Sequence, residues 1–341
     1  MEQIEKILKQ KYPNEEVDIL DFANQLHELN LIDKIDDVKV NNNQIKIEKL
    51  GFTWISPKVG QFFFNKLSYF VYSTLFIINI GLISKHPSLF PRYEDIFVFN
   101  SMSLNILLWM VVTFILVLVH EMGHVLAMRA YNLPTKLNIG HRFFLVVLET
   151  DMSSAWKLSA NRRNVFYLAG IIFDTILMSI SLVSQLFLPN SFGILSGIMS
   201  LAVLDLLMKM IYQLCVYMKT DLYYVYENIT GCYNLMENAQ ETIKKWLPFK
   251  HAAHKNEVIF ADEERTVFFY SIFYFVGVLL TLSLFVFFYI PQLWFAVNKS
   301  IPGLLKGPTS ISFWDAVVFI LQLLIGLYLL LYSWRKKYLQ N

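Results

Sequence analysis

Two histidines and a glutamate stand together in an otherwise apolar run of the chain, HEMGH at residues 120–124. On an α-helix, His120 and His124 lie one turn apart on the same face, so both imidazoles can bind one metal ion. Glu121, between them, can hold and deprotonate a metal-bound water. Ionisable side chains are costly in apolar surroundings unless they are paired or bind a metal. The motif therefore predicts a Zn²⁺ site with Glu121 as the general base.

A catalytic zinc usually has three protein ligands and a water, so an acid from elsewhere in the chain must complete the site. The apolar part of the chain offers four candidates: Glu149, Asp174, Asp205 and Asp221. Asp205 precedes Lys209 by one helical turn, and an ion pair between them is the simpler explanation. Asp221 ends the fourth apolar span at the depth expected for HEMGH. We therefore favour Asp221 as the third ligand.

The composition indicates that this ligand set lies in a membrane protein. Hydrophobic residues make up 55% of the 341 residues and charged residues only 16%, whereas soluble domains have roughly 25% charged residues. The net charge of +2 and the lack of a basic stripe argue against a nucleic-acid partner. The two cysteines, Cys215 and Cys232, are too few for a disulfide framework.

The elements that must position the ligands are apolar spans, each near the roughly 20 residues that a membrane helix needs. We predict six: 66–85, 103–130, 164–188, 192–218, 266–290 and 312–334. Lys and Arg gather in the second and fourth connections and in the tail, which predicts that these segments and both termini face the cytoplasm. The protein is thus expected to be an integral membrane protein, in a bacterial cell membrane, with the lipid bilayer as its solvent.

Between the second and third spans, the run RFFLVVLETD at 142–151 is too short to cross. It is rich in Phe and Val, which predicts a membrane-associated β-hairpin, and an edge strand in 143–149 could receive a peptide by β-augmentation. An ordinary re-entrant loop remains the alternative. We predict amphipathic helices in residues 222–264. His251 and His254 lie at helical spacing there, and a solvated helix face explains this pair better than a second metal site does.

The first 57 residues differ from the rest of the chain. They hold many charged residues, apolar residues at helical spacing, and an alternating run with a turn at Asn41–Asn43. No apolar h-region is present, so we expect no cleavable signal peptide. We predict a cytoplasmic α+β module of winged-helix size at 1–57, which either caps the membrane part or binds a peptide, followed by a membrane-embedded domain at 58–341 with its core at 103–235. The predicted fold class is therefore an all-α polytopic membrane protein with about six transmembrane helices.

Four stretches resemble one known family. They are HEMGH at 120–124, ETDMSSAW at 149–156, RRNVFYLAGIIFD at 162–174 and QLCVYMKTDLYY at 213–224. In order, spacing and flanks these resemble the site-2 protease group of intramembrane zinc metalloproteases, and more closely its branch of peptide zinc metalloproteases found beside ribosomal peptide clusters. The resemblance covers roughly residues 115–235. It implies the fold of an intramembrane Zn²⁺ endopeptidase, with Asp221 as the third zinc ligand. It also implies that Asp151 and Trp156 shape a loop and take no part in the chemistry.

The chain departs from the family pattern at four positions. Gln213 and Val216 replace an Asn and a Pro, Leu222 replaces a Gly, and Asp174 replaces an Asn. In the family, the Asn, Pro and Gly shape an unwound segment that brings the Asp to the metal. These departures put the geometry of Asp221 in question, although the ligand types are retained.

The expected function is that of an intramembrane zinc metalloendopeptidase that cuts a membrane-associated or ribosomally made peptide. Its partners would be that peptide or a transmembrane segment, together with peptide-maturation or export proteins. The alternative is an accessory protein that binds a peptide for immunity or transport without cutting it. Zinc content and the effect of Glu121→Gln would separate the two.

Overall fold

A computed structural model divides the chain into two units, Met1–Leu50 and Gly51–Asn341. It describes residues 2–11, 13, 18–28, 32, 34, 35, 38, 39, 51–142, 145–187, 193–246 and 263–340. Residues 51–57, which we had assigned to the first module, belong to the second unit, where Ile55 is buried in a core with Val125 and Phe166.

The first unit contains two short amphipathic helices, α1 (Glu2–Lys11) and α2 (Ile19–Glu28). Strands β1 (Lys34–Ile35) and β2 (Val38–Lys39) pair antiparallel. The hairpin predicted around Asn41–Asn43 lies outside the described residues. The winged-helix-like recognition role of this unit stays a prediction.

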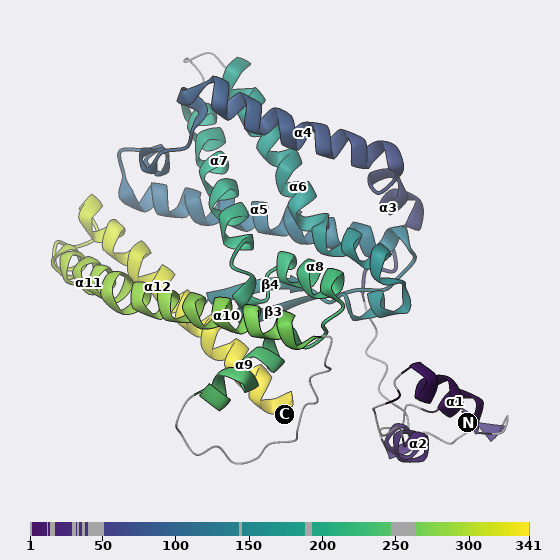
Figure 1. Ribbon diagram of the computed structural model, residues 1–341. Helices are drawn as coiled ribbons and strands as arrows, with labels where there is room; N and C mark the ends of the chain where they lie inside the picture. Colours follow the sequence, from purple (N-terminus) through teal and green to yellow (C-terminus); the bar gives the residue numbers. More distant parts are fainter. Residues whose placement is uncertain are drawn as a thin grey trace. The chain divides into compact units, whose positions relative to one another are not determined.

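The second unit is built from helices (Figure 1). The helices are α3 (Pro57–Phe63), α4 (Lys66–Lys85), α5 (Met102–Ala130), α6 (Ala160–Phe187), α7 (Gly193–Gln213), α8 (Asp221–Thr230), α9 (Leu235–Trp246), α10 (Glu264–Leu284), α11 (Ile290–Leu304) and α12 (Ile311–Gln340). Single-turn helices η1 (Pro87–Leu89), η2 (Tyr93–Ile96), η3 (Ser153–Lys157) and η5 (Val216–Met218) lie between them.

Among the described residues, six helical stretches are long and apolar enough to cross a membrane: α4, α5, α6, α7, α10 continued by α11, and α12. The number of spans agrees with the prediction. The fifth span differs, because we expected it to end at residue 290 and it continues to Leu304. Pro291 follows a π-helical turn, η6 (Phe285–Tyr289). Proline lacks the N–H for the usual helical bond, and the wider turn lets the helix pass it without ending.

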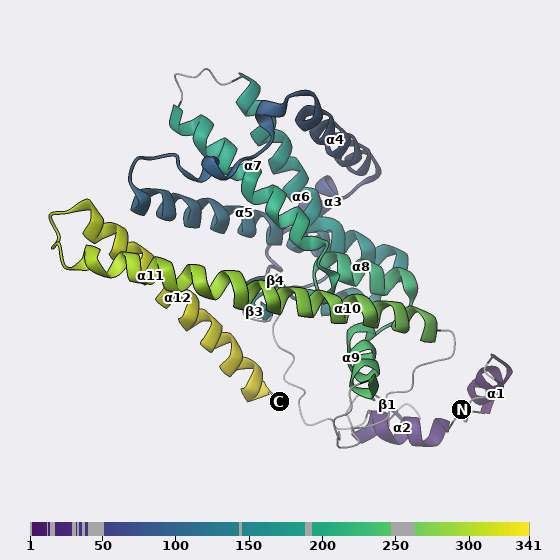
Figure 2. The same ribbon diagram turned by 60° about the vertical axis from the view of Figure 1, so that its left-hand side comes forward.

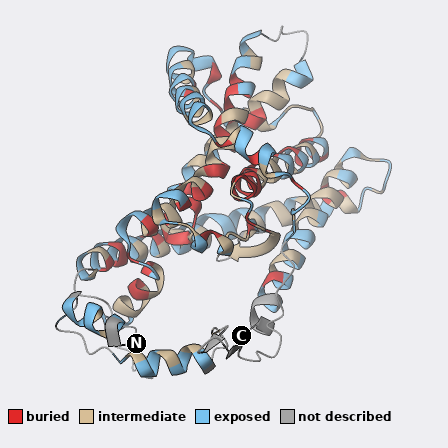
Figure 3. Cartoon of the chain, turned by 90° about the vertical axis from the view of Figure 1, so that its right-hand side faces the viewer, coloured by how far each residue is buried: buried red, intermediate tan, exposed pale blue. Residues whose placement is uncertain are grey.

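Helix α6 is central to the second unit and packs against α4, α5, α7 and α8. In Figure 2 the rod formed by α10 and α11 lies along one side, beside α12. Buried residues gather where α5 and α6 meet their neighbours, and exposed residues face outward (Figure 3). In the apolar stretch of α6 that is long enough to cross a membrane, 61% of the residues are buried, whereas the corresponding stretch of α12 has 11%. A buried helix with this many neighbours is suited to hold a site in fixed geometry.

Two glycines allow helices to approach α5 closely. A Cβ at Gly60 would lie 2.4 Å from the backbone nitrogen of Ala130, and one at Gly123 would lie 2.6 Å from the carbonyl oxygen of Ala169. Larger residues at these positions would push α3 or α6 away from α5. The second of these contacts lies beside HEMGH and therefore sets the distance between α5 and α6 there.

The predicted hairpin is present. Strand β3 (Leu137–Arg142) pairs antiparallel with β4 (Leu145–Thr150), so that Leu137 faces Thr150. The hairpin packs against α5 and α12. The amphipathic helices predicted after the fourth span are present as α8 and α9, whereas His251 and His254 lie outside the described residues.

Candidate metal centre

Helix α5 carries the HEMGH motif, and its His120, Glu121 and His124 are all buried. The two rings lie one turn apart, as the spacing predicted, with their centroids 5.0 Å apart. Their Nε2 atoms are 3.3 Å apart. The i and i+4 positions therefore bring the two possible ligand atoms to one point.

Asp221 reaches the same point from another helix. It is the first residue of α8, and the chain between α7 and α8 is not α-helical: it contains η5, and Lys219 there is left-handed, with φ of 53°. Asp221 Oδ2 lies 3.0 Å from His120 Nε2 and 3.4 Å from His124 Nε2. His120, His124 and Asp221 thus form a buried group whose ligand atoms lie within 4.8 Å of one another and could hold a metal ion.

The outer nitrogen of each ring has its own partner. His124 Nδ1 lies 2.7 Å from the carbonyl oxygen of Phe166, and His120 Nδ1 lies 2.7 Å from Asp174 Oδ2. A carbonyl oxygen and a carboxylate oxygen accept hydrogen bonds, so both Nδ1 atoms donate. In the neutral rings, both Nε2 atoms then carry lone pairs. Partners of this kind usually orient metal-binding histidines.

These tautomers direct three lone pairs, those of the two Nε2 atoms and of Asp221 Oδ2, at one another. Such an arrangement is repulsive until a cation or a proton lies among them. A proton can bridge two of the three atoms, whereas a metal ion can bind all three. Two imidazoles and one carboxylate are also a usual ligand set for Zn²⁺. The donor set therefore fits zinc.

Gln213, the last residue of α7, holds the Asp221 carboxylate. Its Nε2 donates to Asp221 Oδ2 at 2.9 Å, and its Oε1 accepts from the Asp221 backbone N–H at 3.0 Å. Its carbonyl oxygen also accepts from the Thr220 hydroxyl at 2.8 Å. The family pattern has an Asn at this position. Here the longer side chain bridges the end of α7 and the start of α8, and the segment between them is unwound without the expected Pro and Gly.

Gly170 of α6 lies directly against both imidazoles. A Cβ at this position would lie 2.4 Å from His120 Nε2 and 2.6 Å from His124 Nε2. No side chain other than hydrogen fits there without moving the ligand atoms. Helix α6 therefore supports the site in three ways, through Gly170, Asp174 and the carbonyl group of Phe166.

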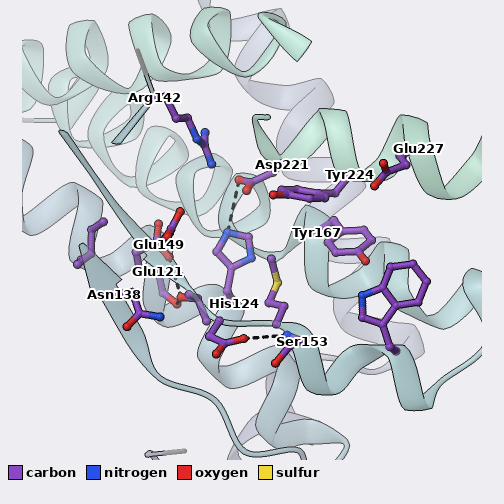
Figure 4. A pocket seen from close by; sticks show the side chains of 15 residues that line it. Glu121, His124, Asn138, Arg142, Glu149, Ser153, Tyr167, Asp221, Tyr224 and Glu227 are labelled. Atoms are coloured by element: carbon purple, nitrogen blue, oxygen red, sulfur yellow. Dashed lines mark hydrogen bonds and ion pairs between the residues drawn. The ribbon is translucent and has the colours of Figure 1, made fainter. Parts of the chain in front are cut away.

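Glu121 is bound by the hairpin. The Thr150 hydroxyl, at the end of β4, donates to Glu121 Oε2 at 2.7 Å. This contact fixes the carboxylate at the edge of a cavity of about 300 Å³ that His124 and Asp221 also line (Figure 4). A group in this position can exchange protons with a molecule in the cavity.

The cavity that Glu121, His124 and Asp221 line is called the metal-site cavity below. The rest of its wall is mainly polar and aromatic. It is formed by Asn138, Arg142, Leu148, Glu149, Thr150, Asp151, Met152, Ser153, Trp156, Tyr167, Tyr224 and Glu227. In Figure 4, the Arg142 side chain points toward Asp221, and the Tyr224 ring lies beside Asp221. Burial raises the pKa of Tyr224 to about 12, so its hydroxyl stays protonated. Burial also raises the pKa of Glu227. A hydrogen bond from the Tyr223 hydroxyl partly offsets this rise.

The other candidate third ligands have different places. Asp174 lies behind the His120 ring, on Nδ1, and so orients a ligand. Glu149 lines the metal-site cavity but is not a member of the group that could hold the ion. Asp205 lies 3.5 Å from Lys209, in the predicted ion pair.

Most of the ETDMSSAW stretch forms the connection between β4 and α6, and its residues stabilise that connection. Asp151 Oδ1 accepts from the Ser153 backbone N–H at 3.0 Å, and its own N–H donates to the Lys136 carbonyl oxygen at 2.8 Å. The Arg163 guanidinium lies 4.1 Å from the centre of the Trp156 ring, a cation–π contact that ties the stretch to α6.

Four supporting groups were not identified from the sequence: Gly170, Gln213, Thr150 and the carbonyl group of Phe166. All four lie within the stretches that carry the family resemblance, and Gln213 was noted there only as a departure from the family pattern, because a residue type alone does not show which ring or acid it will contact. A backbone carbonyl leaves no signal in the sequence.

Comparison of the chain with protein-family models, with curated proteins and with solved structures finds no match.

Proposed function

We propose that this chain is a membrane-embedded zinc endopeptidase of the site-2 protease type, with His120, His124 and Asp221 as zinc ligands and Glu121 as the catalytic base. The observation that supports this most is the convergence of two Nε2 atoms and one carboxylate oxygen beside a buried glutamate that faces a cavity. The resemblance of the four stretches to that group supports the same conclusion.

Zinc bound there would lower the pKa of its water toward neutrality and polarise the scissile carbonyl. Glu121 is placed to take a proton from water in the cavity and would return it to the leaving amine, as a general base and then a general acid. The Thr150 hydroxyl holds Glu121 Oε2 during both transfers.

Two hydrogen-bond donors on the cavity wall suit the developing negative charge on the carbonyl oxygen. Arg142 points toward the ligand group, and Tyr224 keeps its proton (Figure 4). Fixed donors in a site with little water stabilise such charge more strongly than water does. We assign this role to Arg142 first, because a guanidinium carries a full charge.

The substrate in this proposal is a peptide, either membrane-associated or ribosomally made. A helical peptide has its carbonyls in internal hydrogen bonds, so the segment to be cut must be extended in the cavity. Peptide-maturation or export proteins are the proposed partners, with the Met1–Leu50 unit as the element that recognises the peptide.

The test compares native protein with Glu121→Gln, purified in full and measured for zinc content and for cleavage of peptides from producing cells by mass spectrometry. We expect about one zinc in both proteins and a fall in cleavage of roughly 10²- to 10⁴-fold in the variant, the usual contribution of a general base. If the variant keeps full biological activity with its metal, the chain is instead a non-cutting peptide-binding accessory protein.

A further inference from the structure

A second cavity lies beside the metal-site cavity. Its volume is about 490 Å³, within the roughly 300–1,000 Å³ that ligand pockets occupy. Its lining residues are His141, Arg142, Glu149, Met218, Lys219, Tyr224, Met236, Glu237, Gln240 and Tyr274. Arg142, Glu149 and Tyr224 also line the metal-site cavity, so these three side chains form the boundary between the two cavities.

The walls of this second cavity are rich in hydrogen-bonding and charged groups of both signs. Lys219 Nζ lies 2.5 Å from Glu237 Oε1, and both side chains are partly exposed, at 35% and 42%. Gln240 donates to the Tyr274 hydroxyl at 3.0 Å. Groups that keep contact with water can exchange it for a polar ligand at little cost.

A third hollow in the same unit shows the contrast. It lies between α4 and α6, has a volume of about 420 Å³ and is lined by Tyr69, Tyr72, Ser73, Phe76, Ile77, Leu168, Ile171, Ile172 and Thr175. Both helices are long and apolar enough to cross a membrane, so that hollow suits hydrocarbon. The second cavity is unlike it, because α8, α9 and the connection between α7 and α8 line it together with the hairpin and one residue of α10.

We propose that the second cavity is a subsite for a polar, extended peptide segment that continues from the cleaved segment, past Arg142 and Tyr224. This inference rests on the proposed function, and it narrows the substrate class: the peptide carries a hydrophilic stretch next to the scissile bond, and an apolar membrane helix alone does not fill the site. Peptide N–H and C=O groups and polar side chains find partners along Lys219, Glu237 and Gln240. An acyl chain or an apolar helix would take these charged and polar groups out of water without offering them new partners, which is costly.

The test measures binding apart from cleavage. Full-length, zinc-loaded Glu121→Gln protein is titrated into three fluorescein-labelled peptides that share one core sequence: the core alone, the core extended by a Ser/Asn/Gln segment, and the core extended by an apolar segment of equal length. The extensions are placed at either end of the core in separate probes, because the structure does not set the direction of the peptide.

We expect the polar extension at one end to lower Kd about tenfold relative to the core, or about 1.4 kcal/mol. Glu237→Lys should remove this gain, because it replaces the Lys219 ion pair with a repulsion inside the subsite, and it should leave binding of the core unchanged. Glu241→Lys is the matched control. It makes the same charge change on α9, at a residue that pairs with Lys244, and neither is among the lining residues of the second cavity.

The polar-subsite proposal is overturned if the polar extension gives no gain at either end, if the apolar extension gains as much, or if Glu237→Lys and Glu241→Lys act alike. Failure of the proposed function gives a different result. If native protein cuts none of the probes while the polar extension still tightens binding in a Glu237-dependent way, the subsite stands and the protease does not.

Discussion

Asp205 with Lys209 on α7, and His120 with His124 and Asp221 where α5 meets α8, are two groups of ionisable side chains that differ in how their donors and acceptors balance. In the first, Asp205 on α7 lies 3.5 Å from Lys209 one turn later. Asp205 Oδ1 also accepts from the Thr113 hydroxyl at 2.7 Å and from Trp109 Nε1 at 3.3 Å. Negative charge there faces a cation and two donors from the protein itself, although Asp205 Oδ2 and Lys209 Nζ make no direct hydrogen bond.

The second group, His120, His124 and Asp221, is arranged in the opposite way. The outer nitrogens are used by Asp174 and by the carbonyl group of Phe166, and the inner atoms are all acceptors. The two groups therefore differ in whether the protein itself supplies the positive charge that faces the acidic side chain. The cation that faces Asp205 comes from the protein, whereas the atoms that meet at Asp221 leave a place for a proton or a metal ion.

Asp221→Ala should separate the two groups most clearly. It removes the carboxylate that faces both Nε2 atoms, so we expect zinc content to fall from about one to near zero per chain, with loss of cleavage. Metal analysis of the purified protein measures this. Retention of zinc by Asp221→Ala would contradict the ligand assignment.

Gly170→Ala should have nearly as large an effect without changing any ligand. The added methyl group would overlap His120 Nε2 and His124 Nε2, so we expect zinc loss in a protein that still folds. Gly81→Ala is the matched control, since a Cβ there meets nothing within 4 Å. Equal zinc content in the two variants would show that the rings are placed differently.

Asp174→Asn keeps the size of the side chain and removes the charge behind the His120 ring. Loss of a partner of this kind typically weakens metal binding by about 10- to 100-fold. Competition with a chelator measures this affinity. An unchanged affinity would mean that Asp174 does not set the His120 tautomer.

Gln213→Ala should have a smaller effect, because Asp221 keeps its place at the start of α8 while it loses one side-chain donor and one acceptor. We expect about a tenfold loss of zinc affinity, near the lower end of the range for such partners. Gln185→Ala is the control, since Gln185 bonds to Ser181 and Ser200 on α6 and α7. A loss as large as that of Asp221→Ala would mean that Gln213 determines the whole α7–α8 connection.

The double variant Asp205→Leu/Lys209→Leu should change least. Replacing a buried ion pair by apolar residues of similar volume is often neutral, so we expect native zinc content, cleavage and thermal stability. A loss of zinc in this double variant would show that the Asp205–Lys209 pair contributes to the metal site, and the two groups would then not be independent.

Much of the architecture could be predicted from the sequence, for physical reasons that act locally. The length of apolar runs indicated six spans, and the spacing in HEMGH placed two ring nitrogens on one helical face. A run at 142–151 that is too short to cross a membrane and is rich in Phe and Val indicated a hairpin, which is present as β3 and β4. Depth along the fourth span singled out Asp221, which lies with the two histidines in the structure.

The parts that could not be predicted depend on contacts between distant segments. The fourth helix ends at Gln213, earlier than residue 218, because the Gln213 side chain binds the start of α8. The close approach of α6 at Gly170 depends on how two helices cross. The continuation of the fifth span past Pro291 depends on a π turn that no residue pattern marked.

The hydrogen bond between His124 and the carbonyl group of Phe166 has a mechanical consequence. Helices rise about 5.4 Å per turn, so sliding α6 along α5 by a full turn would take the carbonyl group out of reach of the ring. The hydrogen bond therefore opposes sliding of α6 along α5. If the proposed function holds, an opening that admits a peptide would come more readily from a helix with few buried residues, such as α12, than from this pair.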